Sequence, residues 1–254
     1  MLSRPLALLA ALLGSAVALG QAPCPCPPAP EGPPPLWTGK AELSYVATSG
    51  NTDTSSLGAG FELNYKPAPW VFTLTGAYLR ASSDGDLKAE SLAGGLRGAR
   101  DLTPRIDIFA AALYYRNRFA GIDSRYGGEA GAGYKIIDEK TLRLRGEAAV
   151  GYTREDPVDL PPQVSPAFSY ATARAGLDFG WKFSKNAELT ELVSWTDNLK
   201  TTSDWFLRST TALTASLTSV FALKASYTYL YDNVPVPGFE KRDTITSVAL
   251  VAKF

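Results

Sequence analysis

Charged residues recur at every second position in several segments, most clearly at Arg143, Arg145 and Glu147. Side chains two residues apart point to the same face of a β-strand, so these three would share one surface. Arg174 and Asp178 carry the pattern into the next segment, where opposite charges could form a ladder across neighbouring strands. Such a ladder can act in two ways: as a constriction that filters ions, or as a brace that closes a narrow barrel.

Residues suited to catalysis or metal binding are scarce. The 254 residues include no histidine, and the only two cysteines, Cys24 and Cys26, lie close together in a proline-rich segment. A serine nucleophile would need another base beside it, and no such arrangement is recognisable. The sequence also has no paired metal motif, phosphate-binding glycine loop or basic nucleic-acid patch. We therefore expect a protein that is not an enzyme, holds no cofactor or metal and binds no nucleic acid.

The charged residues must be positioned by β-strands, because a period of two persists from Trp37 onwards. Segment 37–47 places Leu43 on one face and Lys40 and Glu42 on the other. The same alternation recurs in 55–66, 126–136, 142–152, 168–183, 205–217 and 221–231. Four further segments, around 70–80, 88–100, 105–117 and 186–197, alternate less cleanly. We count about twelve strands, an even number within the range of bacterial outer-membrane barrels.

The connections between these segments alternate between short and long. Short turns such as "TP" at 103–104 interleave with longer loops. The loop predicted over 153–167 carries Glu155, Asp156 and Asp159 among prolines. These acids are expected to be solvated, although they could also gather divalent cations near lipid headgroups. Tight turns at one end and roomier loops at the other are typical of a transmembrane, antiparallel, up-and-down β-barrel with both termini in the periplasm.

The alternation also predicts which face meets water. In a membrane barrel the apolar face contacts lipid and the charged face lines the lumen. The predicted lumen-lining residues are Lys40, Glu42, Glu62, Glu129, Arg143, Arg145, Glu147, Arg174, Asp178 and Arg208. A soluble barrel or β-sandwich would alternate as well, but it would bury its apolar face in a dry core. Strands of about ten to thirteen residues, aromatic residues near strand ends and many charges on one face favour the membrane barrel.

The first 36 residues differ in composition from the rest. Residues 1–20 combine Arg4, an apolar run and small residues, the pattern of a cleaved secretory signal peptide rather than a permanent anchor helix. Residues 21–36 are rich in proline and are expected to form a disordered, extended spacer. Lipid attachment at Cys24 is the less favoured alternative. The barrel domain is therefore expected over residues 37–254.

The chain ends on an alternating segment, "ITSVALVAKF", whose last residue is Phe254. An aromatic end with apolar residues at alternate positions upstream resembles the C-terminal signature of bacterial outer-membrane proteins, which the barrel-assembly machinery recognises. We therefore predict that Phe254 is an assembly signal and that its ring rests at the inner membrane interface.

The opening hairpin carries a more specific motif. The stretch "WTGKAELSYVATSGNTDTSSLGAGFELNY" contains Trp37, Gly39, Ser49, Gly50, Asn51 and Thr52. Together with Phe254, it resembles a family of salt-induced outer-membrane proteins of unknown function, over roughly residues 37–254. The resemblance implies an outer-membrane barrel and supplies no catalytic residue. Gly50 and Asn51 tolerate positive φ in a turn, so the motif is explained by hairpin geometry, with ligand binding as the alternative.

These observations predict a bacterial outer-membrane protein that is exported through its signal peptide. Its function is expected to be a narrow pore for ions or small solutes, or an envelope role in osmotic stress as the family's name suggests. The alternative is a non-conducting barrel that is structural or binds through its loops. The expected partners are outer-membrane lipids, the assembly machinery and small solutes or ions. With about twelve strands, the lumen is intermediate in width between small filled barrels and open porins. The strand number alone therefore does not decide whether the lumen conducts.

Overall fold

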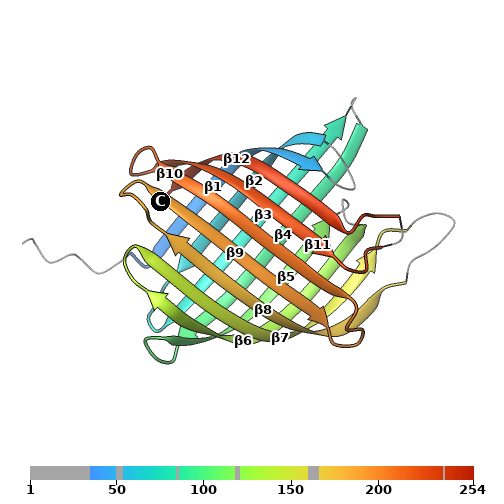
Figure 1. Cartoon of the computed structure of the whole chain (residues 1–254), viewed down its shortest axis with the longest axis horizontal. Coiled ribbons are helices and arrows are strands. Elements are labelled where there is room, and N and C mark those ends of the chain that lie inside the picture. The colour runs from blue at the N-terminus through green and yellow to red at the C-terminus, as the bar shows by residue number, and fades with distance from the viewer. Residues whose placement is uncertain (1–34, 50–53, 84–85, 118–120, 160–165, 237) are drawn as a thin grey trace, which may run out of the picture. The chain divides into compact units, whose positions relative to one another are not determined.

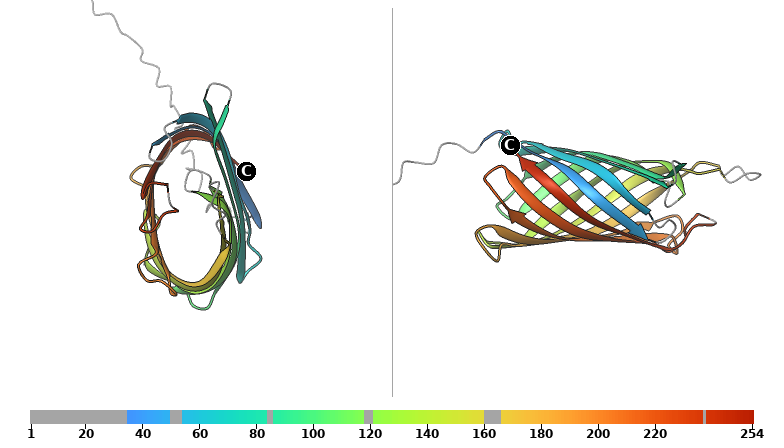
Figure 2. Two further views of the ribbon diagram at one scale, coloured as in Figure 1. Left: turned by 90° about the vertical axis from the view of Figure 1, so that its right-hand side faces the viewer. Right: turned by 90° about the horizontal axis from the view of Figure 1, so that it is seen from above.

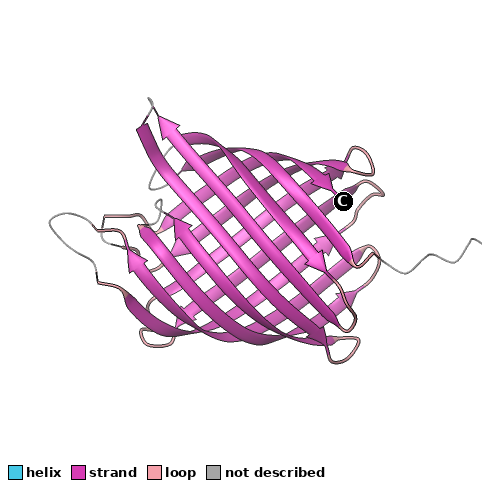
Figure 3. Cartoon of the chain, turned by 180° about the vertical axis from the view of Figure 1, so that it is seen from behind, coloured by secondary structure: helices cyan, strands magenta, loops and turns pink. Residues whose placement is uncertain are grey.

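The computed structural model describes residues 35–49, 54–83, 86–117, 121–159, 166–236 and 238–254. Within them the chain forms twelve antiparallel strands and no helix (Figures 1 and 3). The strands are β1 (Trp37–Ser49), β2 (Thr54–Tyr65), β3 (Trp70–Ser83), β4 (Asp86–Asp101), β5 (Ile106–Asn117), β6 (Ile122–Asp138), β7 (Leu142–Pro157), β8 (Phe168–Trp181), β9 (Ala187–Asn198), β10 (Trp205–Ser216), β11 (Phe221–Asp232) and β12 (Arg242–Lys253). The predicted signal peptide and nearly all of the predicted spacer lie outside the described residues.

The strands close into a barrel in simple sequence order. Each strand pairs with the next, and β1 also pairs with β12, where Leu43 stands opposite Leu250. At the same junction the Gly39 amide donates to the Phe254 carbonyl at 2.7 Å, and the Phe254 amide donates back at 3.0 Å. Closure leaves no open sheet edge. The predicted up-and-down barrel of about twelve strands is confirmed.

One predicted loop is wrong. The chain was expected to leave its strand near residue 153, but β7 continues to Pro157 and pairs with β6 out to Ile122. Glu155 and Asp156 therefore lie in a strand rather than in a solvated loop. The Glu155 side chain points inward and the residue is only 4% exposed, because its carboxylate pairs with Arg125 on β6.

The outward face of the barrel is apolar. Leu43, Leu57 and Val150 are 70%, 75% and 66% exposed, far more than a soluble core would allow. Aromatic side chains stack at the strand ends, as in the Trp37–Tyr65 pair with ring centroids 4.4 Å apart. Strands of 12 to 17 residues exceed the roughly 9–11 residues that a tilted strand needs to cross a bilayer. The barrel is thus a transmembrane fold.

Among the described residues there is no helix with the length and apolar character needed to cross a membrane.

Seen along its axis, the barrel is oval rather than round (Figure 2, left). The inward side chains come from alternate positions of all the strands, so the lumen is the place where polar groups from distant parts of the chain meet. By strand order, β4–β8 form one side of the lumen, and β1, β2, β11 and β12 form the opposite side.

Candidate functional site in the barrel lumen

The lumen holds a cavity of about 820 Å³ with charged walls. This volume lies in the range of about 300–1,000 Å³ that is usual for small-molecule sites. Eight of the ten predicted lumen residues line it: Lys40, Glu42, Glu62, Arg145, Glu147, Arg174, Asp178 and Arg208. Glu129 lines a neighbouring cavity of about 160 Å³. Arg143 lies near the end of β7, where its guanidinium is 3.5 Å from the carboxylates of Asp178 and Glu188.

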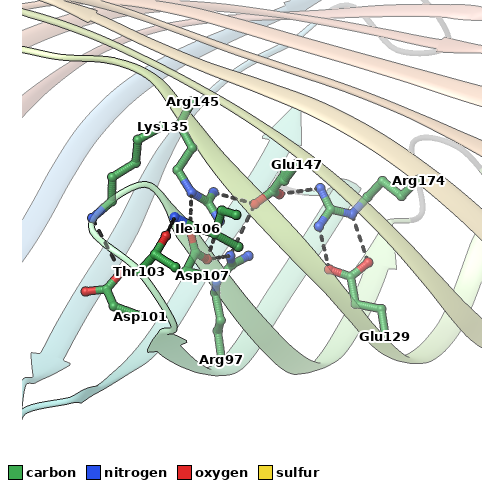
Figure 4. Close-up of polar contacts among 10 residues, drawn as sticks. All are labelled: Arg97, Asp101, Thr103, Ile106, Asp107, Glu129, Lys135, Arg145, Glu147 and Arg174. Carbon is green, nitrogen blue, oxygen red and sulfur yellow. Dashed lines mark hydrogen bonds and ion pairs between the residues drawn. The ribbon is translucent and has the colours of Figure 1, made fainter.

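Glu147 is the centre of an ion-pair network on the β4–β8 side (Figure 4). Its carboxylate accepts hydrogen bonds from Arg145 and Arg174 at 2.6 Å each. Arg97 on β4 donates to the same carboxylate at 3.2 Å. One acid therefore holds three guanidinium groups from three strands, and the Glu147 side chain is only 15% exposed.

Two further carboxylates complete this network. Arg145 donates two hydrogen bonds to Asp107 on β5, at 3.0 and 2.7 Å. Arg174 grips Glu129 on β6 in the same way, at 2.8 and 2.7 Å. Bidentate arginine–carboxylate pairs fix geometry as well as charge. We call the six residues Arg97, Asp107, Glu129, Arg145, Glu147 and Arg174 the ion-pair network.

The network needs a strand position without a side chain. Arg145 on β7 reaches Asp107 on β5 across the intervening strand β6, where Gly133 stands opposite both Asp107 and Glu147. A Cβ atom on Gly133 would collide with the Arg145 guanidinium and lie 2.6 Å from the Asp107 carboxylate. The glycine thus makes room for an ion pair between strands that are not neighbours.

An aromatic ring lies beneath the network. The Arg97 guanidinium carbon is 3.6 Å from the centroid of the Phe109 ring, a cation–π contact. Phe109 points into the lumen and is only 4% exposed. This inward phenylalanine explains why segment 105–117 alternated poorly in the sequence.

The opposite side of the lumen carries simpler pairs. Lys40 lies 3.0 Å from Glu62, its direct partner across β1 and β2. Lys224 on β11 reaches Glu42 on β1 at 2.9 Å, across β12. The Arg208 side chain lines the large cavity, and no described residue forms a hydrogen bond or ion pair with it. The described ion pairs run along the wall from strand to strand, so they brace the barrel and leave the large cavity open.

Several functional residues were missed by sequence reasoning. Arg97 and Asp107 fall in segments with poor alternation, and Arg125 was not among the predicted lumen residues. Arg125 Nε donates a hydrogen bond of 2.6 Å to Glu155 near the loop end of the lumen, and its Nη2 lies 2.6 Å from the same carboxylate oxygen. Tyr170 on β8 donates to the same carboxylate at 3.2 Å. Arg125 lies two residues before Gly127 and four before Glu129, so all three share one face of the strand. This spacing could have identified Arg125 as a lumen residue.

The acid Glu191 lies on the outward, apolar face of the barrel. Glu191 on β9 stands opposite Phe179 and Thr211, and Phe179 faces outward because its neighbour Asp178 lines the lumen. The Glu191 carboxylate accepts hydrogen bonds from Ser209, at 2.6 Å, and from Thr211. Two hydroxyl groups thus satisfy a carboxylate on the apolar face, where an unpaired one would be costly.

The predicted hairpin motif is described only in part. Trp37 stacks on Tyr65, and the Phe254 ring covers Gly39 so closely that a Cβ atom there would collide with it. Only the backbone of Ser49 is described, and Gly50, Asn51 and Thr52 lie outside the described residues. The proposed role of Phe254 in assembly stays a prediction. No group of three or more His, Cys, Asp or Glu side chains is placed to hold a metal ion within the described part of the chain.

The chain belongs to a family of unknown function. The family model described as "Protein of unknown function, DUF481" matches residues 41–254. The chain is similar to the uncharacterized protein YdiY of Escherichia coli (strain K12), with 27% identity over 199 residues that cover 78% of this chain and 75% of YdiY. This agrees with the predicted membership in a family of unknown function.

Solved structures share the fold, among them a porin and an autotransporter domain. The NanC porin superposes with a TM-score of 0.58 and 11% identity, covering 84% of this chain and all of that one. The translocator domain of the autotransporter NalP from Neisseria meningitidis gives a TM-score of 0.52 and 14% identity, covering 88% and 90%. At such low identity the likeness is one of architecture.

Proposed function

We propose that this barrel is a narrow diffusion pore for ions and small polar solutes in the bacterial outer membrane. The observation that carries the proposal is the cavity of about 820 Å³ in the lumen. Its charged side chains need water around them, because burying them dry would cost several kcal/mol per ion. Ion pairs hold most of these side chains against the barrel wall, so the hydrated space in the middle of the lumen stays open to solutes.

The same proposal includes the biogenesis and setting of the protein. Residues 1–20 direct export, Phe254 guides insertion by the barrel-assembly machinery, and the apolar face contacts outer-membrane lipids. The chemistry of the lumen supports passive passage rather than catalysis, since the ion-pair network engages its acids and bases with one another. A role in osmotic stress would follow if passage of ions through the pore changes with external salt.

Arg208 offers the sharpest test of conduction. It borders both the 820 Å³ cavity and a second lumen cavity of about 440 Å³, and no described residue neutralises it. In planar bilayers we expect discrete current steps from the wild type. Arg208→Glu should move the reversal potential in a KCl gradient toward cation preference, since a fixed charge in the lumen changes sign.

Arg105→Glu is the matched control, because Arg105 lies on the exposed turn between β4 and β5 and should leave the reversal potential nearly unchanged. A wild type that stays silent at all voltages and salt concentrations would contradict the pore and support the non-conducting structural barrel instead.

A further inference from the structure

The loop end of the lumen breaks the rule that apolar side chains face lipid. Ile122 on β6 and Leu230 on β11 are 3% and 6% exposed and border the same small lumen cavity. They belong to hairpins on opposite sides of the twelve-stranded ring. Apolar side chains in a water-filled lumen are stable only where other apolar atoms cover them.

The cover is the connection between β11 and β12. We call its residues 233–236 and 238–241 the strap. A Cβ atom on Gly121, in the β5–β6 connection, would lie 2.7 Å from the Phe239 ring and 3.0 Å from Val236 Cβ. The strap therefore crosses the mouth and touches the hairpin on the far side. Gly121 has a φ of 73°, which favours glycine on conformational grounds as well.

Hydrogen bonds hold the strap in this position. The Asp232 amide donates to the Lys241 carbonyl at 2.8 Å, which ties the two ends of the strap together. The Asn233 amide donates to the Trp205 carbonyl at 3.0 Å. The Asn233 side chain donates to the Ser203 carbonyl at 2.8 Å. The strap is thus anchored to β10 and to the connection before it.

The strap closes one part of the mouth almost completely. The cavity that Ile122 and Leu230 share with Pro235 of the strap has a volume of about 10 Å³, at the lower limit for a single water. Beside the strap lies a cavity of about 230 Å³, bordered by Arg125, Tyr170 and Asp204 as well as by Pro235 and Val236 of the strap. Among the described residues, the mouth is thus filled beneath the strap and hollow beside Arg125.

We propose that the strap is a permanent constriction that sets the size limit of the pore. Inorganic ions and very small polar molecules pass beside Arg125 and Asp204, whereas sugars are held back. The inference rests on the proposed pore function and adds where selection by size occurs. It places that selection at the strap and not at the ion-pair network in the middle of the lumen.

Removing the Phe239 ring, through which the strap contacts Gly121, tests the proposal. Phe239→Ala takes away the contact with Gly121, so single-channel conductance in KCl should rise at least about twofold, because the narrowest section limits ion flow. Liposomes that carry the variant should swell in glucose and sucrose, whereas wild-type liposomes should swell only in glycerol. Phe183→Ala is the matched control, because Phe183 lies in the β8–β9 turn at the other end of the barrel, and both readouts should match the wild type.

A labelling experiment covers the case in which Phe239→Ala alters assembly. In a chain with Cys24→Ser and Cys26→Ser, a Leu230→Cys side chain should resist a water-soluble thiol reagent while the strap is intact. Adding Val236→Ser and Phe239→Ala should make it react. Rapid labelling with the strap intact would overturn the proposal.

The outcomes separate the two proposals. A wild type that conducts, with Phe239→Ala unchanged in conductance and solute size, contradicts the strap and leaves the pore standing. A silent wild type contradicts the pore itself, and the size limit with it.

Discussion

The two sides of the lumen stabilise their charges in different ways. On the β4–β8 side, six residues from five strands form one connected network, in which the Arg174 and Glu147 side chains are 16% and 15% exposed. On the opposite side, Lys40 and Glu62 form a pair whose side chains are 40% and 33% exposed, and Glu62 accepts one further hydrogen bond, from the Asn64 side chain. A connected, partly buried network fixes the positions of its strands, whereas a single solvent-exposed ion pair contributes little to the stability of the fold.

The difference originates in small residues as much as in charged ones. Arg145 reaches Asp107 only because Gly133 stands between them. On the other side, a Cβ on Gly60 would lie 3.6 Å from the nearest carbonyl, an ordinary contact. The lumen wall is therefore more tightly packed at Gly133 than at Gly60.

The largest expected effect of a single change is at Glu147. Glu147→Leu leaves Arg97, Arg145 and Arg174 without their shared acceptor, and breaking a buried ion pair costs about 3–5 kcal/mol. The free energy of unfolding, measured by urea titration in lipid vesicles, should fall by roughly that amount. Glu62→Leu, the same change on the opposite side, should cost only about 0.5 kcal/mol. Equal losses of unfolding free energy in the two variants would show that the two sides of the lumen do not differ in how their ion pairs stabilise the barrel.

A smaller effect is expected from the glycines. Gly133→Ala inserts a methyl group into the space of the Arg145–Asp107 pair, and overpacking of this kind costs about 1–3 kcal/mol. Gly60→Ala should be neutral or slightly stabilising, because the site is open and alanine restricts the unfolded chain. The same urea titration measures both variants. A Gly133→Ala barrel as stable as the wild type would mean that the pair adjusts freely and that the glycine is not required.

The sequence allowed prediction of the barrel, its strand number and most of its lumen, since alternation at Arg143, Arg145, Glu147 and Arg174 is clean. It did not reveal Arg97 and Asp107, because Phe109 beneath Arg97 disrupts the pattern that marks the lumen face. Pairs that skip a strand depend on the register of three strands at once, which no local pattern contains. Glu191 was missed for a related reason: its hydroxyl partners lie on the next strand and become visible only once β9 and β10 are aligned.

The central claim is that the charged face lines water and the apolar face meets lipid. Leu213 and Thr214 are neighbours on β10 with opposite orientations, since Leu213 is 47% exposed on the outside and Thr214 stands opposite Lys224 in the lumen. The most direct measurement is cysteine labelling at each position in membranes, in a chain with Cys24→Ser and Cys26→Ser. We predict that Thr214→Cys reacts with a water-soluble thiol reagent, and that a fluorophore attached at Leu213→Cys is quenched by lipid-borne probes. The reverse pattern would contradict the account.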